Sequence, residues 1–288
     1  MYKRILIFAA AIAALNLTAQ AKVRLPHLLS DGMVIQQNTD AHLWGWASPK
    51  KTVTVTTSWS EDKVQTTAGK DGRFLVSVKT PAASYAPQTI TFDDGDGPTV
   101  VKDVLAGDVW VCAGQSNMEM PVKGFGNCPL KDFNNVVADA ANNIGLRWCK
   151  IPSVESMRPL DDAACRWLPS DVSNVSEESA TGYFFGRMLS RSLQIPIGLI
   201  EANKGGSRVE SWLNKAYLKK YTDEKLDSQS IVKNCKYDYL HSLTWGNGTF
   251  SPILNTSIKG IIYYQGCSNV GYHTSDYAFR LSKLVEQW

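Results

Sequence analysis

The chain has 288 residues, of which 44% are hydrophobic and 20% are charged. This length and composition predict one large domain or two ordinary ones, and they exclude an intrinsically disordered chain. Thirty Lys and Arg against 27 Asp and Glu leave a formal net charge of +3, with no block of like charges, which argues against nucleic-acid binding.

Aromatic side chains are abundant, with nine Trp and 11 Tyr. Such side chains gather where sugars bind, and they also fill the cores of β-rich proteins. We favour the core interpretation.

Residues 1–21 have the pattern of a signal peptide. Lys3 and Arg4 form a positive start, residues 5–17 are mostly apolar, and Ala19 and Ala21 fit a small-x-small cleavage site. The apolar stretch is short for a membrane span, and no later segment is long and apolar enough to cross a bilayer. We therefore expect an exported protein, periplasmic or secreted, that begins near Lys22.

Export would permit disulfides, but the sequence does not choose among the possible pairings of its six cysteines. The cysteines have no CxxC spacing and the chain has only four His, so a structural zinc site is not expected. Cys112 lies in an apolar strand, where we expect it to pack as a small hydrophobic side chain.

Residues 22–106 have the pattern of an all-β domain. Residues 51–59 (KTVTVTTSW) alternate Val with Thr or Ser, residues 73–79 (RFLVSVK) form a second strand candidate, and turn-forming residues separate them. This spacing predicts a small β-sandwich without helices.

From residue 107 the pattern becomes α/β. Strands are predicted at 109–112, 146–151, 197–200 and 258–264, the last buried on both faces. Helices are predicted at 179–193 and 275–288, the first with an apolar face made of Phe184, Phe185, Met188, Leu189 and Leu193. The alternation predicts a parallel sheet with helices on both faces.

The segment 107–121 (GDVWVCAGQSNMEMP) carries the strongest chemical signal. A buried strand ends at Cys112, a tight turn follows, and Ser116 stands where a helix would begin. A serine at such a turn can serve as a nucleophile, because the helix N-terminus offers N–H groups to a developing negative charge. The alternative is an N-cap, a common role of serine.

Six segments together resemble the sialate O-acetylesterase-like branch of the SGNH hydrolases. They occur in the family's order and cover residues 29–288: 29–37 (LSDGMVIQQ), 43–47 (LWGWA), 114–120 (GQSNMEM), 205–212 (GGSRVESW), 247–254 (NGTFSPIL) and 263–269 (YYQGCSN). The resemblance implies a small β-sandwich followed by a flavodoxin-like, three-layer SGNH hydrolase domain, here residues 107–288.

The resemblance also implies the site residues. Ser116 would be the nucleophile. The N–H groups of Ser116 and Gly206 and the side chain of Asn269 would hold the oxyanion, and Gln265 would lie nearby. Taken alone, the Gly206 segment could be a plain loop, and Asn269 could belong to a turn or cap.

Two departures from the family pattern matter. The glutamate of the family's Gln-Gly-Glu-Ser-Asn block is Cys267 here. The family's catalytic His, with an Asp a few residues before it, lies in a C-terminal segment beyond residue 288, so the chain is expected to be a fragment lacking its general base. His273, followed by Asp276, is the remaining candidate, although we expect a solvent-facing loop there.

The function implied is a carbohydrate esterase that removes O-acetyl groups from sialic acids or other acetylated glycans through a Ser acyl-enzyme, without metal or cofactor. The first rival is a catalytically impaired carbohydrate-binding protein of the same fold. The second is a structural or adhesive module that works through residues 22–106. The expected partner is an acetylated sugar, with no nucleic acid, and the sequence leaves the oligomeric state open.

Overall fold

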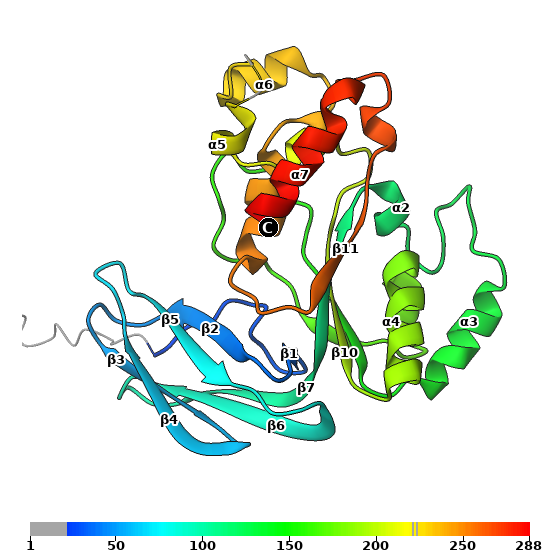
Figure 1. Cartoon of the computed structure of the whole chain (residues 1–288). Coiled ribbons are helices and arrows are strands. Elements are labelled where there is room, and N and C mark those ends of the chain that lie inside the picture. Colours follow the sequence, from blue (N-terminus) through cyan, green and yellow to red (C-terminus); the bar gives the residue numbers. More distant parts are fainter. Residues whose placement is uncertain (1–21, 221, 223) are drawn as a thin grey trace, which may run out of the picture.

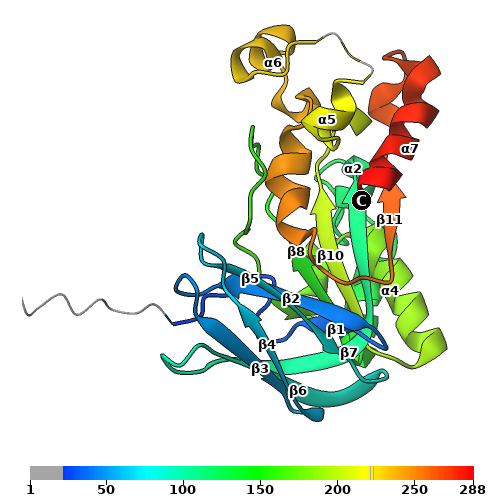
Figure 2. The same cartoon turned by 60° about the vertical axis from the view of Figure 1, so that its left-hand side comes forward.

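The computed structural model describes residues 22–288 except 221 and 223 (Figures 1 and 2). The predicted signal peptide, residues 1–21, therefore lies outside the described residues. No helix in the described part is long and apolar enough to cross a membrane.

The strands are β1 (Val34–Gln36), β2 (Asp40–Trp46), β3 (Thr52–Thr57), β4 (Ser60–Thr67), β5 (Arg73–Lys79), β6 (Ser84–Asp93), β7 (Thr99–Gly114), β8 (Leu146–Lys150), β9 (Trp167–Pro169), β10 (Ile197–Asn203) and β11 (Gly260–Tyr264). The α-helices are α2 (Ser116–Glu119), α3 (Phe133–Asp139), α4 (Ala180–Leu193), α5 (Lys215–Leu218), α6 (Ser228–Asn234) and α7 (Tyr277–Gln287).

Residues 22–98 form strands and turns without a helix, and the two strands predicted from alternation correspond to β3 and β5. In β5 the side chains alternate strictly between exposed and buried positions. Strand β5 pairs antiparallel with β2, whereas β3 pairs antiparallel with β4 and β6. The β2–β5 pair is thus a separate small sheet beside the large one.

Strand β7 connects the two parts of the molecule. Its first part pairs antiparallel with β6, and its second part pairs parallel with β10 and β11. The boundary predicted between residues 106 and 107 therefore falls inside this strand. One hydrophobic core runs continuously from Val23 to Leu284.

The second part confirms the predicted α/β fold. Strands β8, β10, β7 and β11 lie parallel and next to one another in this order. The side chains of β11 show that helices cover both faces, because Ile262 packs into the cluster that contains α4, whereas Ile261 and Tyr263 pack with Leu284 of α7. Successive side chains of a strand point to opposite faces, so α4 and α7 lie on opposite sides of the sheet.

Two expectations about burial are wrong. Strand β11 is not buried on both faces throughout; its side chains are only partly buried, because within the described residues it pairs with β7 alone and forms an edge. On α4, Met188 and Leu193 are exposed, whereas Phe184, Phe185 and Leu189 are partly buried and pack against the core. The fully buried positions of the helix are Ala180, Gly182, Tyr183, Gly186 and Ser190. A Cβ on Gly186 would lie 2.8 Å from Leu199 Cδ1, so close packing on β10 favours glycine at this position.

Candidate active site

The candidate site lies where β7, β10 and β11 end. Gln115 N donates to Tyr264 O over 3.0 Å, and Lys204 N donates to Gly114 O over 3.0 Å, so the three strand ends are tied together. Gly114 has a φ of 144°, and a Cβ there would lie 2.2 Å from the Tyr264 carbonyl oxygen. Only glycine fits this turn. The carboxyl ends of parallel strands are the usual place for a ligand site in an α/β sheet.

Ser116 is the first residue of α2 and is partly exposed. The N-cap position belongs to Gln115, whose side chain makes no capping hydrogen bond, so the alternative of Ser116 as an N-cap does not hold. Within the described residues, Ser116 Oγ has no hydrogen-bond partner. Its hydroxyl is therefore available for chemistry.

Gln115 fixes this turn to the segment that follows β11. Its side-chain oxygen accepts from Gly266 N over 3.1 Å and from Ser268 N over 3.3 Å, and its amide nitrogen lies 3.3 Å from Ser268 Oγ. Gln115 is 4% exposed. No local sequence pattern predicts this role of Gln115, because its partners lie about 150 positions further along the chain.

The loop after β10 lies directly beside Ser116. Gly205 N donates to Glu119 Oε2 over 2.7 Å. A Cβ on Gly205 would lie 2.5 Å from Glu119 Oε2 and 3.7 Å from Ser116 Cβ. The structure thus brings together the segments 114–120 and 205–212, which are both predicted to contribute to the site.

Gly206 has a φ of 77°, and a Cβ there would lie 2.6 Å from Tyr239 Cδ2. In the described part of the chain, neither Gly206 N nor Ser116 N finds an acceptor. Two backbone donors near an unpaired serine hydroxyl can stabilise the oxyanion formed during acyl transfer.

Asn269 and Gln265 are also in this region, but their amide groups already have partners. Asn269 is 2% exposed and donates from Nδ2 to Glu210 Oε2 over 2.9 Å, while its Oδ1 accepts from Val209 N over 3.1 Å. Gln265 Nε2 donates to Asn269 Oδ1 over 2.8 Å and to Ser207 O over 3.1 Å. The predicted role of Asn269 as an oxyanion donor therefore stays a prediction, since its amide hydrogens are directed to Glu210 here.

Glu210 is the centre of this second group of residues. Its carboxylate forms a salt bridge with Arg280 on α7, and their side chains are only 5% and 3% exposed. A buried carboxylate requires such a partner, because desolvation of an unpaired charge is costly. The pairing of Glu210 with Arg280 was not predicted, because it joins positions 70 residues apart.

No histidine in the described part of the chain is hydrogen-bonded to Ser116. His273 is exposed on a loop with a φ of 49°, and its ring packs against Tyr272 with 4.4 Å between centroids. The Asp276 carboxylate lies 3.9 Å from Arg280 Nη2 rather than on His273. His241 is buried and bonds to Glu155 Oε1 over 2.6 Å.

Cys267 takes the place of the family's glutamate and is an exposed, free cysteine. The other five cysteines are free as well, and Cys112 is fully buried in the sheet, where it packs as expected. Burial, together with the nearby carboxyls of Glu201 and Glu178, raises the pKa of the Cys112 thiol well above its usual value. A neutral, enclosed thiol is a poor nucleophile, so Ser116 has no competitor at this strand.

Two buried glutamates lie near the segments that flank Ser116: Glu201 is paired with Cys112 across β10 and β7, and Glu178 O accepts from Val122 N. Both Glu178 and Glu201 have no exposed surface. Burial raises the pKa of Glu201 to about 7, even though Ser179 N donates to its Oε1 over 2.6 Å. Burial also raises the pKa of Glu178 well above its usual value, so the two carboxyl groups carry protons at acidic pH.

Comparisons with known proteins agree with this geometry. A family model described as carbohydrate esterase, sialic acid-specific acetylesterase, matches residues 106–288. The sialate O-acetylesterase of Homo sapiens is 30% identical over 285 residues, which cover 92% of this chain and 52% of the human one. That of Mus musculus is 27% identical over an alignment of 318 positions, which covers 96% of this chain and 58% of the mouse one.

A solved structure is also similar. The crystal structure of a carbohydrate acetylesterase from Xanthomonas citri matches with a TM-score of 0.78 and 30% identity, covering 92% of this chain and 57% of that chain. The chain spans about half the length of the curated relatives it matches. The fold, the serine at the end of β7 and the extent of the family match agree: this chain belongs to the sialic acid-specific acetylesterase family of carbohydrate esterases.

Proposed function

We propose that the chain carries the nucleophile and the backbone oxyanion donors of an esterase that removes O-acetyl groups from sialic acids or other acetylated glycans. The observation that carries the proposal is the position of Ser116, with a hydroxyl that has no partner in the described chain, beside the Gly205 loop. The family match and the names of the relatives supply the substrate class.

The reaction would proceed in two steps. Ser116 Oγ attacks the acetyl carbonyl carbon, and the N–H groups of Ser116 and Gly206 stabilise the oxyanion of the tetrahedral intermediate. The intermediate collapses to acetyl-Ser116, and the sugar leaves as an alcohol after it receives a proton. Water then attacks the acetyl group and releases acetate, restoring the serine hydroxyl.

Both steps need a general base to take a proton from Ser116 and later from water. No described histidine is hydrogen-bonded to Ser116, and His273 lies on an exposed loop with its ring packed against Tyr272. We propose that the base is an Asp–His pair in a polypeptide segment beyond residue 288. The greater length of the matched relatives supports this proposal.

The test is acetate release from 4-nitrophenyl acetate and from 9-O-acetyl-N-acetylneuraminic acid. The 288-residue chain and a version extended along the reading frame are each compared with their Ser116→Ala variants. We expect the extended version to hydrolyse both esters and Ser116→Ala to reduce the rate by about a thousandfold or more. Ser192→Ala, which alters an exposed serine on α4, serves as the matched control.

Intact-mass spectrometry separates the two steps of this reaction. If the base lies beyond residue 288 as proposed, the 288-residue chain should accumulate little acetyl-Ser116, because nothing in it would activate the hydroxyl. Equal rates for the extended enzyme and its Ser116→Ala variant would overturn the proposal. Acetylated xylo-oligosaccharides, offered alongside the sialic acid ester, would show whether the substrate class is broader than sialic acids.

A second candidate function is glycan binding without turnover. It is favoured by the position of His273 and by the bonding of Asn269 to Glu210 rather than towards Ser116. Saturable binding of 9-O-acetyl-N-acetylneuraminic acid by the extended protein, with no acetate released, would support this candidate over the esterase.

We also propose that the protein is exported, on the basis of the signal-peptide pattern in residues 1–21. N-terminal sequencing of the protein recovered from its host should begin near Lys22. A mature protein that retains Met1 would contradict the proposal.

A further inference from the structure

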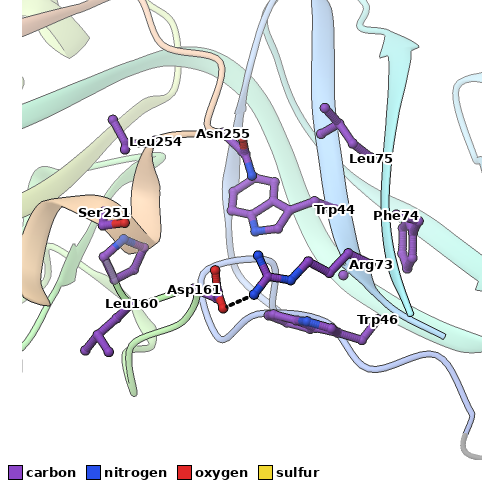
Figure 3. Close-up of a pocket in the computed structure, with 12 residues that line it drawn as sticks. Trp44, Trp46, Arg73, Phe74, Leu75, Leu160, Asp161, Ser251, Leu254 and Asn255 are labelled. Carbon is purple, nitrogen blue, oxygen red and sulfur yellow. Dashed lines mark hydrogen bonds and ion pairs between the residues drawn. The ribbon is translucent and has the colours of Figure 1, made fainter. Parts of the chain in front are cut away.

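A cleft of about 390 Å³ lies between the β2–β5 pair and the second part of the molecule (Figure 3). Trp44 and Trp46 of β2 and Arg73 and Leu75 of β5 line one side, and segments that include Asp161 and Asn255 line the other. In Figures 1 and 2 the β2–β5 pair lies near the start of β7, whereas α2 with Ser116 follows the end of that strand. The cleft is therefore separate from the candidate active site.

The strand register gathers the four side chains on one face. Trp44 is paired with Leu75 and Trp46 with Arg73 across the two strands. Residues directly opposite each other, and residues two apart on a strand, point to the same face of a sheet. The result is a compact patch that alternates aromatic, aliphatic and charged groups.

This face could have been closed by packing, but it is partly open. Leu75 is 47% exposed and Trp46 is partly exposed, whereas Trp44, at 6% exposure, is nearly buried and only borders the cleft. Figure 3 shows the Trp44 indole beside the Arg73 guanidinium, with Asp161 opposite the guanidinium and joined to it by a dashed line. A cavity of this size with an apolar wall and a few converging polar groups is typical of a small-ligand site.

The charges in the cleft are balanced. The Arg73 guanidinium is paired with the Asp161 carboxylate, and its Nε lies 3.5 Å from Asp71 Oδ2. Arg24, which covers the Trp46 ring at 3.5 Å, is itself paired with Asp162 over 3.4 Å. Among the described residues that line the cleft, the cation Arg73 already has carboxylate partners. An anionic ligand would therefore gain little binding energy from charge attraction here.

A sugar ring has the matching chemistry. The C–H groups of a pyranose form an apolar face that packs on Leu75 and the exposed part of Trp46, and its hydroxyls both donate and accept hydrogen bonds. Arg73 supplies donors, Asp161 supplies acceptors and the Asn255 amide supplies both. We propose that this cleft binds a neutral pyranose residue of a glycan. Binding here does not depend on hydrolysis at Ser116, and it would hold a polymer or branched glycan close to the enzyme.

The test is nuclear magnetic resonance of the full chain labelled with ¹⁵N in its Trp residues. Lactose and cellobiose are titrated as neutral probes, and N-acetylneuraminic acid is the anionic probe. The Trp44 indole signal is assigned from a Trp44→Phe spectrum. We expect at least one neutral disaccharide to shift the Trp44 indole signal saturably, with a dissociation constant in the millimolar range.

Variants separate this site from others. Arg73→Ala and Asn255→Ala remove polar groups from opposite walls, and each should weaken disaccharide binding by about tenfold, equivalent to about 1.4 kcal/mol. Lys79→Ala, which removes an exposed cation from the other end of β5, should leave it unchanged. Thermal melting confirms that each variant is folded.

Three results would overturn the proposal. One is the absence of any shift of Trp44 with either disaccharide. Another is binding that Arg73→Ala and Asn255→Ala leave unchanged. The third is tighter binding of N-acetylneuraminic acid than of the neutral sugars, which would show that the balanced charges do not set the ligand class. Because no ester is cleaved in this experiment, its outcome is independent of whether Ser116 is a nucleophile.

Discussion

The two sides of the candidate active site differ in how their polar groups are used. On the side of β7 and β10, Ser116 Oγ and the N–H groups of Ser116 and Gly206 have no partner within the described chain. On the side of β11 and α7, Asn269, Gln265 and Glu210 are bonded to one another and to Arg280. On the first side, the polar groups remain available to bind a substrate. On the second side, the polar groups are paired with one another and stabilise the fold. Substitutions should therefore affect activity on the first side and stability on the second.

The largest effect on stability is expected at the Glu210–Arg280 pair. Arg280→Met leaves the Glu210 carboxylate buried without its cation, which should lower the free energy of unfolding by about 3–5 kcal/mol. Urea denaturation measures the change. The double variant Glu210→Gln/Arg280→Met should lose less than the sum of the two single variants, and strict additivity would show that the pair does not act as a unit.

The buried glutamates should make stability depend on pH. Glu201 binds its proton more tightly in the folded state, where its pKa is about 7, than at its ordinary value of 4.5. Its contribution is thus complete below pH 4.5 and is lost as the pH rises through 7, by about 3 kcal/mol in total. Urea denaturation at pH 5 and pH 8 measures the loss, and Glu201→Gln should reduce it. Glu177→Gln, at an exposed neighbouring position, is the control and should show the wild-type dependence.

Gln115 links the two sides, and its loss should have an intermediate effect. Gln115→Ala removes the acceptor for Gly266 N and Ser268 N in a buried place, which should cost about 1–3 kcal/mol. Hydrogen exchange at these two amides measures the effect locally. Unchanged exchange would show that Gln115 does not hold the segment after β11.

The smallest effect on stability is expected at the residue with the largest expected effect on activity. Ser116→Ala removes a hydroxyl that makes no hydrogen bond within the described residues, so the free energy of unfolding should change by less than about 0.5 kcal/mol. A loss of 2 kcal/mol or more in urea would show that Ser116 has a structural role, and the contrast between the two sides of the site would fail.

Several features follow from local sequence alone. The alternation in residues 73–79 predicts a strand with one buried face, and β5 has that pattern. The strand–turn–helix pattern around Ser116 is local too, and with the ordered motifs that follow it identifies the family. Such features can be predicted from a single sequence because periodicity and turn chemistry depend on neighbouring residues.

Other features were decided only by the tertiary structure. On α4, Gly186 is buried while Met188 and Leu193 are exposed, because the close approach of the helix to β10 decides which side chains fit. The bonding of Asn269 to Glu210 and of Glu210 to Arg280, and the cleft formed by Trp44 and Asn255, join residues far apart in the chain. The sequence determined the strands and helices and the position of Ser116 at the turn after β7. The packing of distant segments decided which polar groups are paired and which remain available for a ligand, because pairing depends on distances that no local pattern contains.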